Sequence, residues 1–246
     1  MASETIVKAS WGPRPESCEE LAGRWLALLE RLTELSGGDL ADWRWDTDGA
    51  TPGEPVPRDV DALATALEAA NPHDDADIIG RTGVVVARRP DGGYAQLKVT
   101  AGGTDGYTPF SATLLLFPGS PGSPGSPGSP DTAAPLADRL PEALAAVAGV
   151  WDADTGSTHD RELFRALKSA YGLRASHPRC GWSVFLSANR AARVPADLAA
   201  PRLEAGSGGV VLKIGDTTDA VLAAHKALAD AGALEPLPTP ADRPKL

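Results

Sequence analysis

The sequence predicts an α+β fold, in which a mixed, largely antiparallel sheet of about six strands carries about five helices. Strand-like and helix-like runs are mixed along the chain and do not strictly alternate. Asp91-Gly92-Gly93 separates the β-rich runs 82–89 and 94–100, which predicts an antiparallel hairpin. With 246 residues and 42% hydrophobic content, the chain can bury a substantial core, so we expect a single domain over 1–246.

The first elements have clear sequence signals. The β-branched run 5–9 predicts a strand. Ser17 and Glu20 have the spacing of a capping box, and apolar residues at steps of three and four predict a helix over 17–35. We expect an irregular stretch over 39–57.

The later elements follow from the same kinds of pattern. A helix is predicted over 58–70, and the run 107–117 predicts a third strand beside the hairpin. Residues 119–130 are Gly-Ser-Pro repeated four times, a low-complexity composition that cannot bury a core and predicts an exposed loop. The remaining predictions are helices over 135–148 and 159–171, strands over 181–188 and 209–214, and a last helix between Asp216-Thr217-Thr218 and Gly232.

The charge distribution is uneven. The formal net charge of −10 argues against a nucleic-acid binder or a protein of anionic membranes, since both need basic surface. Eleven carboxylates and two arginines lie within 39–77, which suggests an acidic face for a basic partner. The candidate contact residues are Asp42, Asp46, Asp48, Asp74, Asp75 and Asp77.

Several features concern the cellular location. The first residues show no secretory signal, and no apolar run approaches the roughly 20 residues of a membrane span. Cys18 and Cys180 lack metal-type spacing, and two cysteines in a chain of this size suggest a reducing compartment, although a disulfide between them stays open. We therefore expect a cytoplasmic protein.

The enzymatic alternatives rest on weak patterns. Pro90-Asp91 with Gln96 and Lys98 has the residue types of a metal-dependent nuclease site, but Asp91 is better interpreted as part of a plain β-turn. Asp154, His159 and Asp160 suggest an acid–base cluster without a nucleophile. The acidic run 74–77 favours a solvated loop over a cation site. We expect no catalytic residues, no metal site and no cofactor.

Four stretches together resemble the immunity protein 52 family of bacterial polymorphic toxin systems. They are S-W-G-P-R-P-E-S-C-E-E-L-A-G-R-W (10–25), P-R-C-G-W-S-V-F-L-S (178–187), G-G-V-V-L-K-I (208–214) and A-H-K-A-L-A-D-A-G-A-L-E-P-L (224–237). The resemblance implies an α+β immunity protein whose partner is a cognate toxin, a restriction-endonuclease-like nuclease domain. It marks Trp11, Arg14, Glu16 and Trp182 as signature positions, which we interpret as fold-forming. The Gly-Ser-Pro tract and the acidic segment depart from the family pattern.

These observations give a leading hypothesis and two alternatives. The leading one is a non-enzymatic immunity protein whose acidic surface occludes the basic, phosphate-tracking groove of a nuclease toxin. The alternatives are a metal-dependent nucleic-acid hydrolase and a structural adaptor that uses the Gly-Ser-Pro tract as a spacer. Trp43 and Trp45 lie among the aspartates, and either would become a candidate interface anchor if it were exposed.

Overall fold

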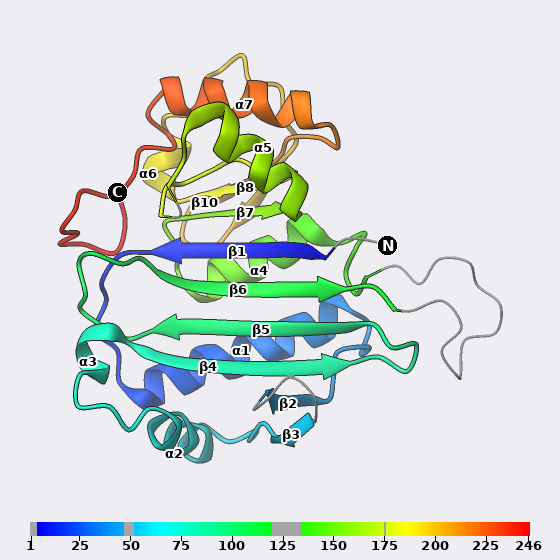
Figure 1. Cartoon of the computed structure of the whole chain (residues 1–246), viewed down its shortest axis with the longest axis vertical. Coiled ribbons are helices and arrows are strands. Elements are labelled where there is room, and N and C mark those ends of the chain that lie inside the picture. The colour runs from blue at the N-terminus through cyan, green and yellow to red at the C-terminus, as the bar shows by residue number, and fades with distance from the viewer. Residues whose placement is uncertain (1–3, 47–51, 120–133, 175) are drawn as a thin grey trace.

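One antiparallel sheet of ten strands forms the centre of the protein (Figure 1). The computed structural model describes residues 4–46, 52–119, 134–174 and 176–246. Those residues form ten strands and seven helices. The predicted α+β class holds, but the predicted counts of about six strands and about five helices were wrong. The Gly-Ser-Pro tract, apart from Gly119, lies outside the described residues.

The strands are named in chain order. They are β1 (Thr5–Trp11), β2 (Trp43–Asp46), β3 (Pro52–Pro55), β4 (Arg81–Arg88), β5 (Tyr94–Ala101), β6 (Phe110–Phe117), β7 (Thr155–His159), β8 (Ser183–Leu186), β9 (Arg202–Ala205) and β10 (Gly209–Lys213). Their order across the sheet is β3-β2-β4-β5-β6-β1-β7-β8-β10-β9. Because β1 lies between β6 and β7, the N-terminal strand joins the predicted meander of β4, β5 and β6 to the second half of the sheet.

The helices are named in the same way. They are α1 (Cys18–Leu35), α2 (Val60–Ala70), α3 (Ala76–Ile79), α4 (Leu140–Val150), α5 (Arg161–Tyr171), α6 (Ala188–Ala191) and α7 (Thr218–Asp230). The capping box of α1 forms as predicted: Glu20 N–H donates to Ser17 Oγ at 3.2 Å, and Ser17 N–H donates to Glu20 Oε2 at 2.8 Å. The predicted start of α4 was wrong, because Leu136 has a positive φ of 59° and the helix begins only after Arg139.

The unpredicted strands have weak sequence signals for physical reasons. β3 and β9 are the two edges of the sheet, and β3 reads Pro-Gly-Glu-Pro, a composition tolerated at edges because proline cannot donate to the ladder. β2 is a four-residue strand beside that edge, which is why the stretch 39–57 was wrongly expected to be irregular. β7 reads Thr-Gly-Ser-Thr-His and is buried throughout, so its burial comes from its neighbours and not from apolar alternation.

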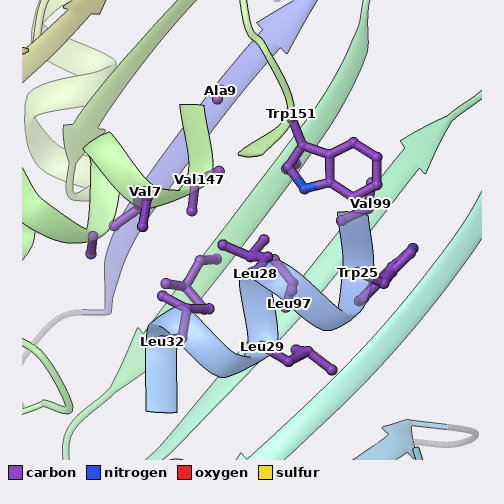
Figure 2. Packing of buried hydrophobic residues seen from close by; sticks show 14 of the residues in the cluster. Val7, Ala9, Trp25, Leu28, Leu29, Leu32, Leu97, Val99, Val147 and Trp151 are labelled. Atoms are coloured by element: carbon purple, nitrogen blue, oxygen red, sulfur yellow. The ribbon is translucent and has the colours of Figure 1, made fainter. Parts of the chain in front are cut away.

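Helices α1, α2 and α4 cover one face of the sheet (Figure 1). Trp25, Leu28 and Leu32 of α1 pack against strand residues such as Val7 and Leu97 (Figure 2). This face carries the larger of two apolar cores. The larger core contains the ring of Trp11 stacked on that of Trp151, with centroids 5.5 Å apart. Stacked aromatic pairs of this kind stabilise a core beyond the contribution of the apolar area that they bury.

The opposite face is covered only in part. Helices α5 and α7 pack over β8 and β10 and form the second apolar core, with Leu163, Val184 and Leu228 among its members. Among the described residues, no helix covers this face of β4, β5, β6 and β1, as Figure 1 shows. We call that uncovered area the open sheet face. Its side chains alternate with those of the larger core along each strand, and all except Val86, which is 3% exposed, are partly or fully exposed. They are Ile6, Lys8, Ser10, Thr82, Val84, Val86, Arg88, Tyr94, Gln96, Lys98, Thr100, Ser111, Thr113, Leu115 and Phe117.

Candidate functional site

Three of the signature positions that the family resemblance marks, Trp11, Arg14 and Glu16, make contacts that hold the fold together. Trp11 is 1% exposed. Arg14 donates to the Trp151 carbonyl at 2.9 Å and pairs with Glu16 at 3.2 Å. Glu16 also pairs with Arg24 at 2.6 Å. These contacts fix the segment between β1 and α1 against the end of α4.

The other tryptophans follow the same pattern. Trp182 is half-buried, and its backbone joins two elements: its N–H donates to Thr158 O at 2.8 Å, and its carbonyl accepts from Ile214 N–H at 3.0 Å. Trp43 is 1% exposed, and the half-buried Trp45 packs against the larger core. Neither Trp43 nor Trp45 offers an exposed anchor for a partner.

The six candidate aspartates do not form one patch. Asp42 and Asp46 lie at β2, Asp74, Asp75 and Asp77 lie at α3, and Asp48 is outside the described residues. Trp43 pairs with Ala87, near the end of β4, whereas α3 leads into the start of that strand. Trp43 to Trp45 of β2 pair with Ala87 to Val85, which lie about 14–20 Å along β4 from its first residue, Arg81, at a rise of about 3.4 Å per residue.

The two carboxylates at β2 are engaged with neighbouring side chains. Arg44 Nε lies 2.9 Å from Asp42 Oδ2. The Gln96 amide donates to Asp46 Oδ2. A partner that used these oxygens would have to displace contacts within the protein, so this group is the weaker candidate.

The group at α3 combines negative charge with exposed apolar side chains. Asp74 and Asp75 are exposed, and the Asp77 side chain is 88% exposed even though it pairs with Arg81 at 2.9 Å. Next to them, Ile78 is 55% exposed and Ile79 is 47% exposed.

A neighbouring loop completes this surface. Asp105 N–H donates to the Ile78 carbonyl at 2.9 Å, and Tyr107 N–H donates to Asp105 Oδ1 at 2.8 Å. Tyr107 is 73% exposed. We call this region the α3 surface, composed of Asp74, Asp75, Asp77, Ile78, Ile79, Asp105 and Tyr107.

The α3 surface has the composition of a protein-binding site, since apolar and aromatic side chains are grouped among charged ones. The sequence predicted Asp74, Asp75 and Asp77 as contact residues. The prediction missed Asp105, Ile78, Ile79 and Tyr107. The run 74–77 was interpreted as a solvated loop, and Tyr107 was placed in a strand that actually begins at Phe110. The available signal was the pair of adjacent isoleucines within an otherwise acidic stretch.

The residues of the hydrolase alternative are not assembled into a site. Asp91 Oδ1 accepts from Gly93 N–H at 2.9 Å and Oδ2 lies 2.9 Å from Arg89, which are the contacts of a hairpin turn. Gln96 and Lys98 project from the open sheet face. Across the part of the chain that the structure describes, no group of three or more His, Cys, Asp or Glu side chains is placed to hold a metal ion.

The residues of the suggested acid–base cluster, Asp154, His159 and Asp160, are each engaged in contacts of their own. Asp154 pairs with Arg190, and Asp160 caps α5 by accepting from Leu163 N–H at 2.8 Å. His159 Nδ1 lies 3.3 Å from Ser157 Oγ. Burial, followed by nearby cationic side chains, lowers the pKa of His159 to about 4. His159 is therefore a neutral, buried side chain and not one poised for acid–base work near neutral pH.

Two further observations concern location and cysteine chemistry. Among the described helices, none is both long enough and apolar enough to span a membrane. Cys18 and Cys180 are both free thiols.

Comparisons with known proteins show a relationship at the level of fold. The solved structure of "Pseudomonas aeruginosa T6SS protein PA0821" matches with a TM-score of 0.51 and 10% sequence identity, over 94% of this chain and 74% of that one. No protein-family model and no curated protein matches the sequence. The resemblance to the immunity protein 52 family therefore stays a prediction.

Proposed function

We propose that this chain is an immunity protein, which binds a cognate toxin of a polymorphic toxin system and neutralises it without catalysis. The observation that carries the proposal is the α3 surface, where Ile78, Ile79 and Tyr107 are exposed beside four carboxylates. Buried aromatic and aliphatic anchors supply most of the binding energy at interfaces, and surrounding charges govern partner choice and association rate. The α3 surface offers both kinds of group.

The charge of this surface favours a basic partner. A nuclease tracks phosphates with lysine and arginine side chains, so its substrate groove is positively charged. Asp74, Asp75 and Asp77 would meet such a groove, and the apolar side chains would hold the complex once water is excluded. The proposed mechanism is occlusion of the groove in the cytoplasm, with a restriction-endonuclease-like nuclease as the preferred class of toxin.

The structural comparison supports this context. A protein named as a T6SS protein shares the fold across most of this chain, which suits a role in competition between bacteria. The sequence resemblance to an immunity family supports the same context on independent grounds.

The test needs a cognate toxin, for which a toxin-like protein encoded by a neighbouring gene would be the candidate, coexpressed and purified with this chain. The double variant Asp74→Lys/Asp75→Lys is expected to slow association about tenfold or more at low salt, because it reverses charge within the proposed interface. Glu30→Lys/Asp216→Lys is the matched control, since it makes the same change of charge at exposed sites on α1 and before α7. The control should change the association rate less than about twofold, because it alters only the net charge of the chain.

A second variant tests the apolar part. Ile79→Ser is expected to speed dissociation of the complex about tenfold, because an anchor side chain that loses its contacts acts on the off-rate. Cells that carry the toxin should then lose protection. If the aspartate and isoleucine variants both bind and protect as the wild type does, the α3 surface is not the interface. If the wild type binds no toxin at all, the immunity assignment itself fails.

A further inference from the structure

A cavity of about 230 Å³ lies where the open sheet face meets α5. Its lining includes Lys8 and Ser10 of β1, Ser157 and His159 of β7, and Arg179 from the segment before β8. The net charge of the whole chain is −10, yet two of these five side chains, Lys8 and Arg179, are basic. None of the residues of the α3 surface lines this cavity, although Thr108 and Pro109, which follow Tyr107 in the chain, do.

The sheet register explains why these side chains converge. Val7 and Ala9 belong to the larger core, so Lys8 between them projects from the opposite face. Lys8 pairs with Ser157 across the β1–β7 ladder, and side chains directly opposite each other in a sheet are neighbours. His159 projects from the same face of β7 as Ser157, two residues along the strand.

Arg179 is held in place from the other side of the cavity. Its Nη2 donates to the Arg174 carbonyl at 2.7 Å, and its guanidinium carbon lies 4.3 Å from the centre of the Phe164 ring. Arg179 is 7% exposed. A buried guanidinium fixed by a carbonyl and an aromatic ring is pre-oriented, so binding a ligand costs it little conformational entropy.

The cavity concentrates positive charge. None of the described residues that line it is an aspartate or a glutamate. The two carboxylates closest in sequence to His159 are engaged elsewhere, because Asp160 caps α5 and Asp154 pairs with Arg190. Burial, followed by the charge of Arg179, lowers the pKa of Lys8, and burial lowers the pKa of Arg179. The two cations therefore repel each other across the cavity. A bound anion would relieve this repulsion.

We propose that this cavity binds a compact oxyanion of the phosphate class. The Lys8 ammonium and the Arg179 guanidinium supply charge-assisted donors, and the hydroxyl of Ser10 supplies a neutral one. The Ser157 hydroxyl adds a second neutral donor in the tautomer in which His159 Nδ1–H donates to Ser157 Oγ. Donors that approach from β1, β7 and the segment before β8 suit a tetrahedral group with oxygens on all sides. The volume lies below the roughly 300 Å³ at which pockets for drug-sized ligands begin, which favours a small anion.

The test is calorimetric titration of the full chain with inorganic phosphate, with sodium chloride at matched ionic strength as the reference. Saturable binding of phosphate and none of chloride is expected. Acetate, which has two oxygens in one plane, and adenosine monophosphate, which is larger, should both bind more weakly than phosphate. Amide resonances of Ser157 and Arg179 should shift on phosphate addition, while those of Asp74, Asp75 and Asp77 should not.

Lys8→Met and Lys98→Met form a matched pair of variants. Both lysines lie opposite Thr113 in the sheet, but only Lys8 lines the cavity. Loss of one charge-assisted hydrogen bond should weaken phosphate binding about tenfold or more in Lys8→Met, and Lys98→Met should match the wild type.

Three outcomes would overturn the proposal. They are equal heats from phosphate and chloride, equal phosphate affinities in the two variants, and tighter binding of acetate or adenosine monophosphate than of phosphate. If Lys8→Met does not fold, the wild-type titration and the mapping of its amide shifts still decide the question.

Discussion

Asp154 and Arg190 form a bidentate ion pair that is almost completely buried. Arg190 Nε lies 2.8 Å from Asp154 Oδ1 and Nη2 lies 2.6 Å from Oδ2, and the Arg190 side chain is 0% exposed. The same carboxylate accepts from Leu246 N–H at 3.0 Å, and Arg190 Nη1 donates to the Ala233 carbonyl at 2.9 Å. One pair thus joins the start of β7, helix α6 and the C-terminal segment.

Removal of the carboxylate should be severe. Asp154→Ala leaves the Arg190 guanidinium buried without its counter-charge, and a broken buried ion pair costs about 3–5 kcal/mol of unfolding free energy. Urea unfolding, followed by tryptophan fluorescence, measures this difference. The exposed pair of Lys226 and Asp230 on α7 is the control, because Asp230→Ala should cost less than about 1 kcal/mol. A similar small loss for both variants would show that the buried pair does not hold these elements together.

Most of the helices and the central meander could be predicted from the sequence, because their signals are local. Ser17 and Glu20 set the start of α1, and Asp91-Gly92-Gly93 sets the turn between β4 and β5. The rest depends on partners distant in sequence. β7 is buried only because β1 and β8 flank it, which no feature of Thr-Gly-Ser-Thr-His indicates.

The candidate sites also combine features with local sequence signals and features that depend on residues distant in sequence. The aspartates at α3 are visible as a run of charge, but the exposure of Ile78 and Tyr107 depends on what covers them in the fold. The cavity draws Lys8 and Arg179 from positions 171 residues apart, which are brought together by the pairing of β1 with β7 and of β7 with β8. The Asp154–Arg190 pair was equally hidden, since both residues lie outside the predicted helices and strands.

Stability should fall as the pH falls from about 6.5 to about 4. Burial and, after it, the charge of Arg179 lower the pKa of His159 and of His225 to about 4 in the folded protein. An unfolded histidine has a pKa near 6.5, so between these values the unfolded chain takes up protons that the folded chain refuses. The stabilising contribution is complete above pH 6.5 and is lost as pH drops to 4.

A substitution at His159 isolates the contribution of this histidine to the pH dependence of the unfolding free energy. His159→Gln removes one titration, so the drop in unfolding free energy between pH 7.5 and 4 should shrink by up to about 3 kcal/mol. His73→Gln, at an exposed position, should leave the drop unchanged. Urea unfolding across this pH range provides the measurement. A drop of the same size in all three proteins would exclude His159 as a source of acid sensitivity.

The capping box of α1 should contribute measurably to stability. Ser17→Ala removes the acceptor for Glu20 N–H and should lower the unfolding free energy by about 1 kcal/mol. Ser207→Ala, in the exposed turn between β9 and β10, is the control and should have little effect. Parallel urea curves for the two variants compare them directly, and an equal effect would mean that the cap adds nothing beyond the packing of α1.

The two thiols should react very differently in the native protein. Cys180 is 0% exposed, and burial raises the pKa of its thiol to about 12, so almost no thiolate exists at pH 8. Cys18, at the start of α1, is only half-buried. Iodoacetamide should therefore modify Cys18 slowly in the folded chain and reach Cys180 only after unfolding, as peptide mass spectrometry would show.

Cys18→Ser is the control for this experiment. The variant should take up no label while folded and one label per chain in urea, because only Cys180 remains. Labelling of Cys180 in the folded variant would mean that the second apolar core opens on the timescale of the reaction. Since Cys180 N–H donates to His225 Nδ1 at 3.3 Å, such an opening would also expose His225 to protonation. The opening equilibrium, obtained from the labelling rate after correction for the smaller thiolate fraction at low pH, should then rise in parallel with the loss of stability below pH 6.5, which links the two measurements through one contact.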